Sequence, residues 1–254
     1  MVPTFDQQSD SNRQVSPPRS GFTLLEGLVV LAIALLLIAL LLPNVRQGGH
    51  REGNQRLQTR NDLKMIGLAL HNYHDEYGMF PPAVLKDDQG TVLHSWRTLI
   101  LPYLDQASLY QKIDLSMPYN DPVNAEAYRT AVNGYRSVYD QSGSAKTRFL
   151  AVVGPDYAFD STRPRKIPEF TAGTSTSFLV IEVAESQAVH WMDPVDADEK
   201  FLKSLGPRGS FPHESGFHAL YADGSVRFIS VKEWVADRNS FLSITGPKST
   251  GATP

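Results

Sequence analysis

The hydrophobic pattern divides the chain into three parts. Residues 1–20 are polar, residues 22–42 are almost entirely apolar, and the remainder mixes apolar and polar positions. Only Thr23 and Glu26 interrupt the apolar run. At about 1.5 Å per residue, a helix over this run would extend about 31 Å, which is the thickness of a bilayer core. The pattern therefore predicts a single transmembrane helix over residues 22–42.

A second helix is predicted over residues 52–77. Apolar and aromatic positions recur there at spacings of three and four residues, at Leu63, Ile66, Leu70, Tyr73 and Tyr77. Such spacing places one apolar stripe on a helix. Pro43 predicts a kink before it, Gly48 and Gly49 would loosen it, and Gly78 suits its C-terminus. We expect a long kinked helix over residues 22–77, half in the membrane and half packed on a domain.

The pattern after residue 78 predicts short helices and antiparallel strands. Short helices are expected at residues 96–101 after a Ser95 cap, at 105–113, and from a Ser230–Glu233 capping box to about residue 242. Strands are expected at residues 148–153, 177–183, 217–222 and 225–229, with mostly loop over 114–141. Asp223-Gly224 predicts a hairpin with a type I′ turn.

The fold class predicted is α+β: a long N-terminal helix followed by an antiparallel β-sheet domain with short helices. The domain would cover residues 78–246, and residues 247–254 would be a frayed tail.

The amino-acid composition excludes several kinds of functional site. The 254 residues include no cysteine, so disulfides and thiolate sites are excluded. The net charge of −3 lacks the basic excess of nucleic-acid binders. The sequence also lacks the phosphate-loop, Gly-x-Ser-x-Gly and His-Glu-x-x-His motifs, and we expect no catalysis and no cofactor.

The apolar run differs from a cleaved secretory signal, because it is longer and ends without a small-residue cleavage site. Its flanking charges favour the opposite orientation to the one proposed below, since two arginines precede the run and Arg46, Arg51, Arg56 and Arg60 follow it.

The start of the run, Gly21-Phe22-Thr23-Leu24-Leu25-Glu26, resembles the type IV prepilin processing site. The resemblance implies cleavage after Gly21 by a prepilin peptidase, removal of residues 1–21 and N-methylation of Phe22. It also implies an assembly role for Glu26, whose carboxylate would meet the positive N-terminus of a neighbouring subunit. A carboxylate in hydrocarbon is costly, so pairing of this kind offsets its desolvation.

Further segments resemble a planctomycete family of paralogous pilin-like proteins that contain a domain of unknown function. The matching segments are residues 61–75, 80–82, 96–104, 151–155 and 173–175, and a closing signature of His213, nine residues, then Asp223-Gly224. The family commonly has two cysteines that this chain lacks, and Thr59 stands at the first place. Their joint absence suggests that they normally pair.

Several residues have both a functional and a structural interpretation. His213 could be a ligand or a base, but such loop histidines are more often hydrogen-bonded structural residues. Asp223 more readily starts a tight turn than binds a metal. Asp193, Asp196 and Asp198 could hold calcium, although a solvated acidic loop is favoured because the run lacks EF-hand spacing. His71 and His74 are expected in packing and surface roles.

Two functions are therefore open. The first is a pilin-like or pseudopilin-like structural subunit of a filament or an export apparatus such as type II secretion. It would sit in the inner membrane with its C-terminal domain outside the cytoplasm and assemble with other pilin-like subunits. The second is a membrane-tethered binding module for a carbohydrate or cell-surface ligand. Its cleft would be built from Trp96, Trp191, His213 and the acidic loop.

Overall fold

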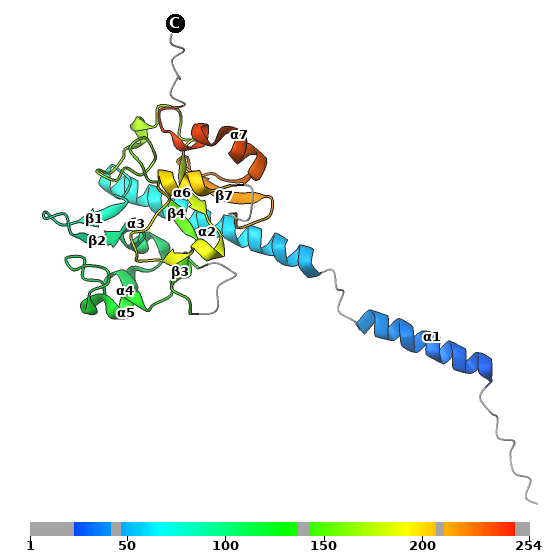
Figure 1. Ribbon diagram of the computed structural model, residues 1–254. Helices are drawn as coiled ribbons and strands as arrows, with labels where there is room; N and C mark the ends of the chain where they lie inside the picture. Colours follow the sequence, from blue (N-terminus) through cyan, green and yellow to red (C-terminus); the bar gives the residue numbers. More distant parts are fainter. Residues whose placement is uncertain (1–22, 42–46, 137–142, 207–210, 247–254) are drawn as a thin grey trace, which may run out of the picture. The chain divides into compact units, whose positions relative to one another are not determined.

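The computed structural model describes residues 23–41, 47–136, 143–206 and 211–246 (Figure 1). Two compact units are present, Met1–His50 and Arg51–Pro254, and each is described by itself. The first contains helix α1 (Leu24–Leu41), and α2 (Gln47–Tyr77) belongs mostly to the second. The predicted kink at Pro43 lies outside the described residues.

Helix α1 presents an apolar surface on all sides. Its exposed large side chains range from 52% exposed at Val29 to 85% at Leu24. Over the described part of the chain, the structure contains no helix of the length and apolarity needed to cross a membrane. The span predicted over residues 22–42 begins and ends outside the described residues.

Helix α2 lies on the second unit through the predicted stripe. Leu63, Ile66 and Leu70 are fully buried and Tyr73 is partly buried, whereas Tyr77 is exposed. The helix begins at Gln47, before the predicted start at residue 52, and it includes Gly48 and Gly49. A glycine costs an α-helix about 1 kcal/mol, which the rest of a long helix can outweigh.

A four-stranded antiparallel sheet forms the centre of the second unit. Its strand order is β4-β5-β7-β8, with β4 at Phe149–Ala151, β5 at Phe178–Glu182, β7 at Gly216–Tyr221 and β8 at Val226–Ser230. Two small antiparallel pairs accompany it, β1 (Val84–Lys86) with β2 (Val92–Ser95) and β3 (Lys146–Thr147) with β6 (Val189–His190). The predicted α+β class is confirmed.

Short helices complete the second unit. They are α3 (Trp96–Leu99), α4 (Ala107–Tyr110), α5 (Ala125–Tyr128), α6 (Glu199–Ser204) and α7 (Val231–Leu242), with 3₁₀ turns at Leu101–Leu104, Pro122–Asn124, Ile167–Glu169 and Glu185–Gln187. The predicted Ser95 cap and the Ser230–Glu233 capping box are both present. α3 and α4 are shorter than predicted, and α5 interrupts the predicted loop.

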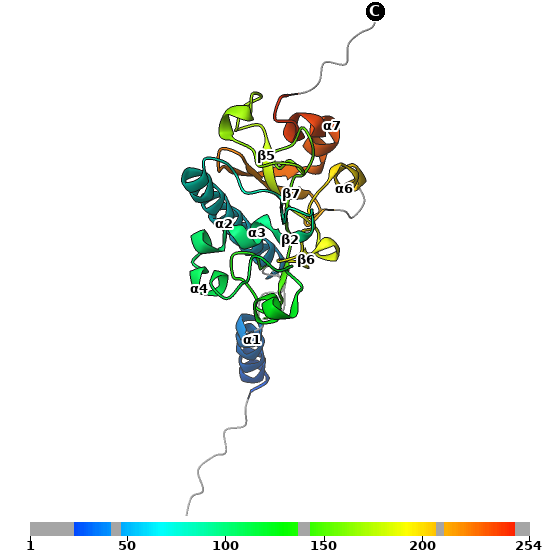
Figure 2. The ribbon, with the colours of Figure 1, turned by 90° about the vertical axis from the view of Figure 1, so that its left-hand side faces the viewer.

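Both faces of the sheet are covered (Figure 2). Residues on a strand alternate between faces, so β7 contributes to two cores. Leu220 packs in the cluster with α2, while Phe217 and Tyr221 pack in the other cluster with Trp234 of α7. Gly67 permits the close approach of α2, because a Cβ there would come within 2.8 Å of Leu220. The sheet face beneath α2 also carries the site described next.

Candidate functional site

A buried cluster of three ionisable side chains lies between the sheet and α2. Glu182 ends β5 and His218 is in β7. Ile181 pairs with Ala219, so the next residues outward, Glu182 and His218, lie opposite each other on neighbouring strands. The three side chains of Glu182, His213 and His218 are 1–6% exposed.

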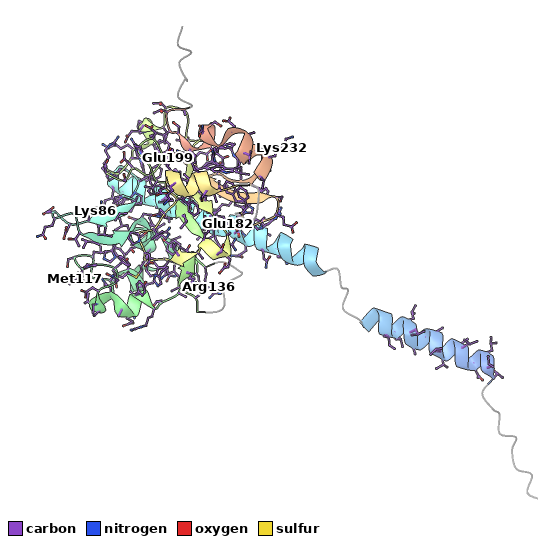
Figure 3. All side chains as sticks on the ribbon, in the orientation of Figure 1. Lys86, Met117, Arg136, Glu182, Glu199 and Lys232 are labelled. Carbon is purple, nitrogen blue, oxygen red and sulfur yellow. The ribbon has the colours of Figure 1, made fainter. Side chains whose placement is uncertain are left out.

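Donors surround the carboxylate of Glu182. Its Oε2 lies 3.2 Å from His213 Nε2, 3.0 Å from His218 Nδ1 and 3.3 Å from the backbone nitrogen of His218. Its Oε1 accepts a hydrogen bond from Arg148 Nη2 at 2.9 Å, and Thr59 Oγ1 of α2 lies 3.5 Å away. Thr59 therefore joins α2 to the cluster, and Figure 3 places Glu182 beside this helix.

The charge of Glu182 is stabilised in spite of burial. Burial alone raises a carboxyl pKa, because the charged form loses its hydration. Here the hydrogen bonds from His213 and His218 and the nearby Arg148 outweigh burial and lower the pKa of Glu182 to about 2. The carboxylate is consequently charged across the physiological pH range.

A tight turn positions His213. The backbone of His213 exchanges hydrogen bonds of 3.2 Å with that of Gly216, which returns the chain to β7 after two residues. A Cβ at Gly216 would lie 1.9 Å from the carbonyl oxygen of Ile229, so only glycine fits between β7 and β8. Arg56 of α2 also donates a hydrogen bond to Ser215 in this turn.

The cluster has the composition of a metal site. Across residues 23–41, 47–136, 143–206 and 211–246, Glu182, His213 and His218 form the one group of three or more His, Asp or Glu side chains whose ligand atoms all lie within 4.8 Å of one another. Two imidazoles and one carboxylate can coordinate a divalent transition metal.

His213 was a candidate site residue from the sequence, whereas its partners Glu182 and His218 were not predicted. Two signals point to them in retrospect: Glu182 is a charged residue that closes an otherwise apolar strand, and His218 follows His213 by five residues. Neither signal is specific without the strand register that brings them together.

The residues of the closing signature lie in two different parts of the domain. His213 lies in the cluster, while Asp223 and Gly224 form the turn between β7 and β8. Asp223 accepts a hydrogen bond from the backbone of Ser225 at 2.8 Å, and Gly224 has a φ of 80°. The hairpin is present, but the predicted type I′ turn was wrong. That turn needs positive φ at both central residues, and Asp223 has none.

The three aspartates of the acidic loop do not form one shared binding surface. Asp196 is buried and pairs with Arg97 at 2.7 Å, so the interpretation as a solvated loop was wrong for this residue. Asp198 caps α6 by accepting from the backbone of Phe201, and Asp193 accepts from the Tyr128 hydroxyl. Each carboxylate thus has its own protein donor.

The tryptophans predicted to line a ligand cleft are buried. Trp96 and Trp191 have no exposed surface, and their indole nitrogens bind Asp196 and the carbonyl of Thr130. The cleft hypothesis was therefore wrong, because these rings fill the core. His71 and His74 pack against Phe80, in keeping with the packing role expected for them.

At the N-terminal motif, Gly21 and Phe22 lie outside the described residues, but Glu26 does not. The backbone nitrogen of Glu26 donates to Thr23 Oγ1 at 3.3 Å, and Glu26 Oε2 lies 3.4 Å from the backbone nitrogen and the hydroxyl of Thr23. This is the geometry of a capping box at the start of α1. This capping box was not predicted, although Thr-x-x-Glu is the usual signature of one.

Comparisons with known protein families agree with the two resemblances in the sequence. Residues 17–42 match the prokaryotic N-terminal methylation motif, and residues 50–137 match a family described as a protein of unknown function (DUF1559). The chain thus contains the N-terminal methylation motif of pilin-like proteins and a segment similar to the DUF1559 family.

The DUF1559 match begins in α2 and ends after α5, so Thr59 lies inside it, whereas Glu182, His213 and His218 lie beyond it. No curated protein and no solved structure matches the chain. The planctomycete origin remains a prediction.

Proposed function

We propose that this protein is a membrane-anchored, pilin-like structural subunit of a filament or an export apparatus. The observation that carries the proposal is the methylation motif over residues 17–42. A prepilin peptidase would cut after Gly21, and Phe22 would become the methylated N-terminus. The domain would then lie outside the cytoplasm, anchored in the inner membrane, and would have no catalysis of its own.

The surface of α1 supports this role. An apolar helix with no polar face is stable only against lipid or protein. The exposed Leu24, Leu25 and Leu28 would contact the bilayer before assembly and the helices of other pilin-like subunits afterwards. The capping box accounts for one role of Glu26, and pairing with a neighbouring N-terminus would be a second role for the same carboxylate.

Mass spectrometry of the N-terminus tests the processing step. The protein purified from its native membrane should begin at an N-methylated Phe22. An intact Met1, or cleavage at another bond, would contradict prepilin processing and leave α1 as a simple signal anchor.

Two variants of Glu26 separate assembly from helix capping. Glu26→Gln keeps the hydrogen-bonding pattern of a capping box but removes the charge, whereas Glu26→Ala removes both. We expect both variants to enter the membrane and both to be lost from crosslinked or sheared assemblies at least tenfold. Normal incorporation of Glu26→Gln would show that capping, and not charge pairing, is the role of this residue.

A further inference from the structure

Three hydrogen-bond donors converge on one oxygen of Glu182. Two histidine ring nitrogens and a backbone N–H all lie within 3.3 Å of Oε2, while Arg148 lies 2.9 Å from Oε1. A carboxylate oxygen offers about two lone-pair directions. Two of the three donors are imidazole nitrogens, and these can bind a cation in place of a proton, which the backbone N–H cannot.

Two of the three separations between ligand atoms fit tetrahedral coordination. Zinc binds histidine nitrogen and carboxylate oxygen at about 2.0–2.2 Å, so two ligands of a tetrahedral ion are about 3.3 Å apart. Glu182 Oε2 lies 3.2 Å from His213 Nε2 and 3.0 Å from His218 Nδ1. All three ligand atoms lie within 4.8 Å of one another, which is close enough for them to share one zinc ion.

The neighbours of Glu182 suit an outer shell. Arg148 holds Oε1, which leaves Oε2 as the single coordinating oxygen. Ligating carboxylates are commonly fixed by such second hydrogen bonds. The guanidinium of Arg148 would repel a cation, but Glu185 also approaches it, with its Oε2 3.9 Å from Arg148 Nε. Its positive charge is therefore shared between two carboxylates.

The ligand chemistry selects the metal class. Calcium requires six to eight oxygen ligands, and magnesium keeps several waters, whereas imidazole nitrogen favours zinc and its neighbours. The strand pairing and the turn before β7 hold the ligands on rigid backbone.

We propose that Glu182, His213 and His218 bind one zinc ion through Oε2, Nε2 and Nδ1, with water as the fourth ligand. The ion would join β5, β7 and the turn at His213 beneath α2. This inference is independent of the proposed assembly role, since it concerns the second unit alone.

Metal titration of the full-length protein in detergent tests the site. After treatment with a chelator, the protein should take up one zinc per chain, and cobalt should give the visible absorption of a tetrahedral site.

Conservative variants locate the ligands. His213→Gln and His218→Asn each place an amide nitrogen near the ring nitrogen they replace, so the hydrogen bond to Glu182 can persist. We expect each to weaken zinc binding more than about 100-fold, beyond the usual effect of an outer-shell residue. His74→Gln, on α2 and outside the cluster, should bind zinc like the wild type.

Two results would overturn the site: absence of zinc uptake by the wild-type protein at stoichiometric concentration, or zinc binding by the cluster variants as tight as that of His74→Gln. If a variant fails to fold, the wild-type protein alone still tests the site. Binding of one zinc per chain must raise the melting temperature of the wild-type protein.

Discussion

Two buried arginine–carboxylate pairs in the second unit differ in what surrounds them. Arg97 and Asp196 are 2.7 Å apart, and Arg148 and Glu182 are 2.9 Å apart, all with side chains at most 5% exposed. Burial raises the pKa of Asp196 above its ordinary value, whereas the pKa of Glu182 is lowered to about 2. The arginine lowers the pKa of the acid in both pairs, but burial outweighs it at Asp196 and is outweighed at Glu182.

The two pairs differ in how their hydrogen bonds are distributed between the arginine and the carboxylate. Arg97 divides its hydrogen bonds among the carbonyls of Phe149, Asp193 and Val195 as well as Asp196. In the other pair both oxygens of Glu182 accept, and two histidines add to Arg148. The first pair is a structural junction centred on the arginine, and the second is a site centred on the carboxylate.

Removing the arginine of the first pair should have the largest effect. Arg97→Met keeps the apolar stem but leaves Asp196 buried without its cation, so we expect a loss of about 3–5 kcal/mol in unfolding free energy. Urea unfolding measures it. In the double variant Arg97→Met/Asp196→Asn part of this loss should return, and a loss below about 1 kcal/mol in the single variant would contradict the junction.

Low pH should remove the stability that the Arg148–Glu182 pair contributes. A lowered carboxyl pKa contributes stability that is present above the unfolded value of 4.5 and lost as pH falls towards 2. The shift corresponds to about 3 kcal/mol. We expect wild-type stability to fall by about that much more than that of Glu182→Gln over this range. Parallel pH profiles would show that Glu182 is not held as a carboxylate.

A buried carboxylate with a neutral partner extends the comparison. Asp62 on α2 accepts from Gln58 at 2.8 Å, and burial raises its pKa to about 6. A raised carboxyl pKa costs stability as pH rises from 3.8 through 6. Asp62→Asn should therefore stabilise the protein by about 1–2 kcal/mol at pH 7, after allowance for solvent screening.

The control for Asp62→Asn is the same measurement near pH 3, where both proteins carry a neutral side chain. Their stabilities should then agree. A variant that is less stable than wild type at pH 7 would mean that the charge of Asp62 has a partner.

The sequence predicted elements whose cause is local. The stripe of Leu63, Ile66 and Leu70, the Ser230 cap and the Asp223-Gly224 hairpin all follow from residues within one turn or one strand of each other. The turn type was wrong because Gly224 alone supplies the positive φ, which the dipeptide does not reveal.

The sites depend on contacts that a local pattern cannot show. Asp196 looked solvated because its partner Arg97 is 99 residues away. Glu182 looked like the end of a strand until the register placed it opposite His218. From the sequence alone, His213 could be either a structural residue or a ligand, because its role depends on where Glu182 and His218 lie.

Helix α2 can pack on its domain only late in folding. This helix is synthesised before the rest of its domain, yet Thr59 meets Glu182 after 123 residues and Arg56 meets Ser215 after 159. Contacts this distant in sequence form slowly, because a long loop must close first. Until β5 and β7 have been made, the apolar stripe of α2 has no surface to cover it. A nascent chain of this protein therefore needs protection from aggregation until almost its last strand has emerged.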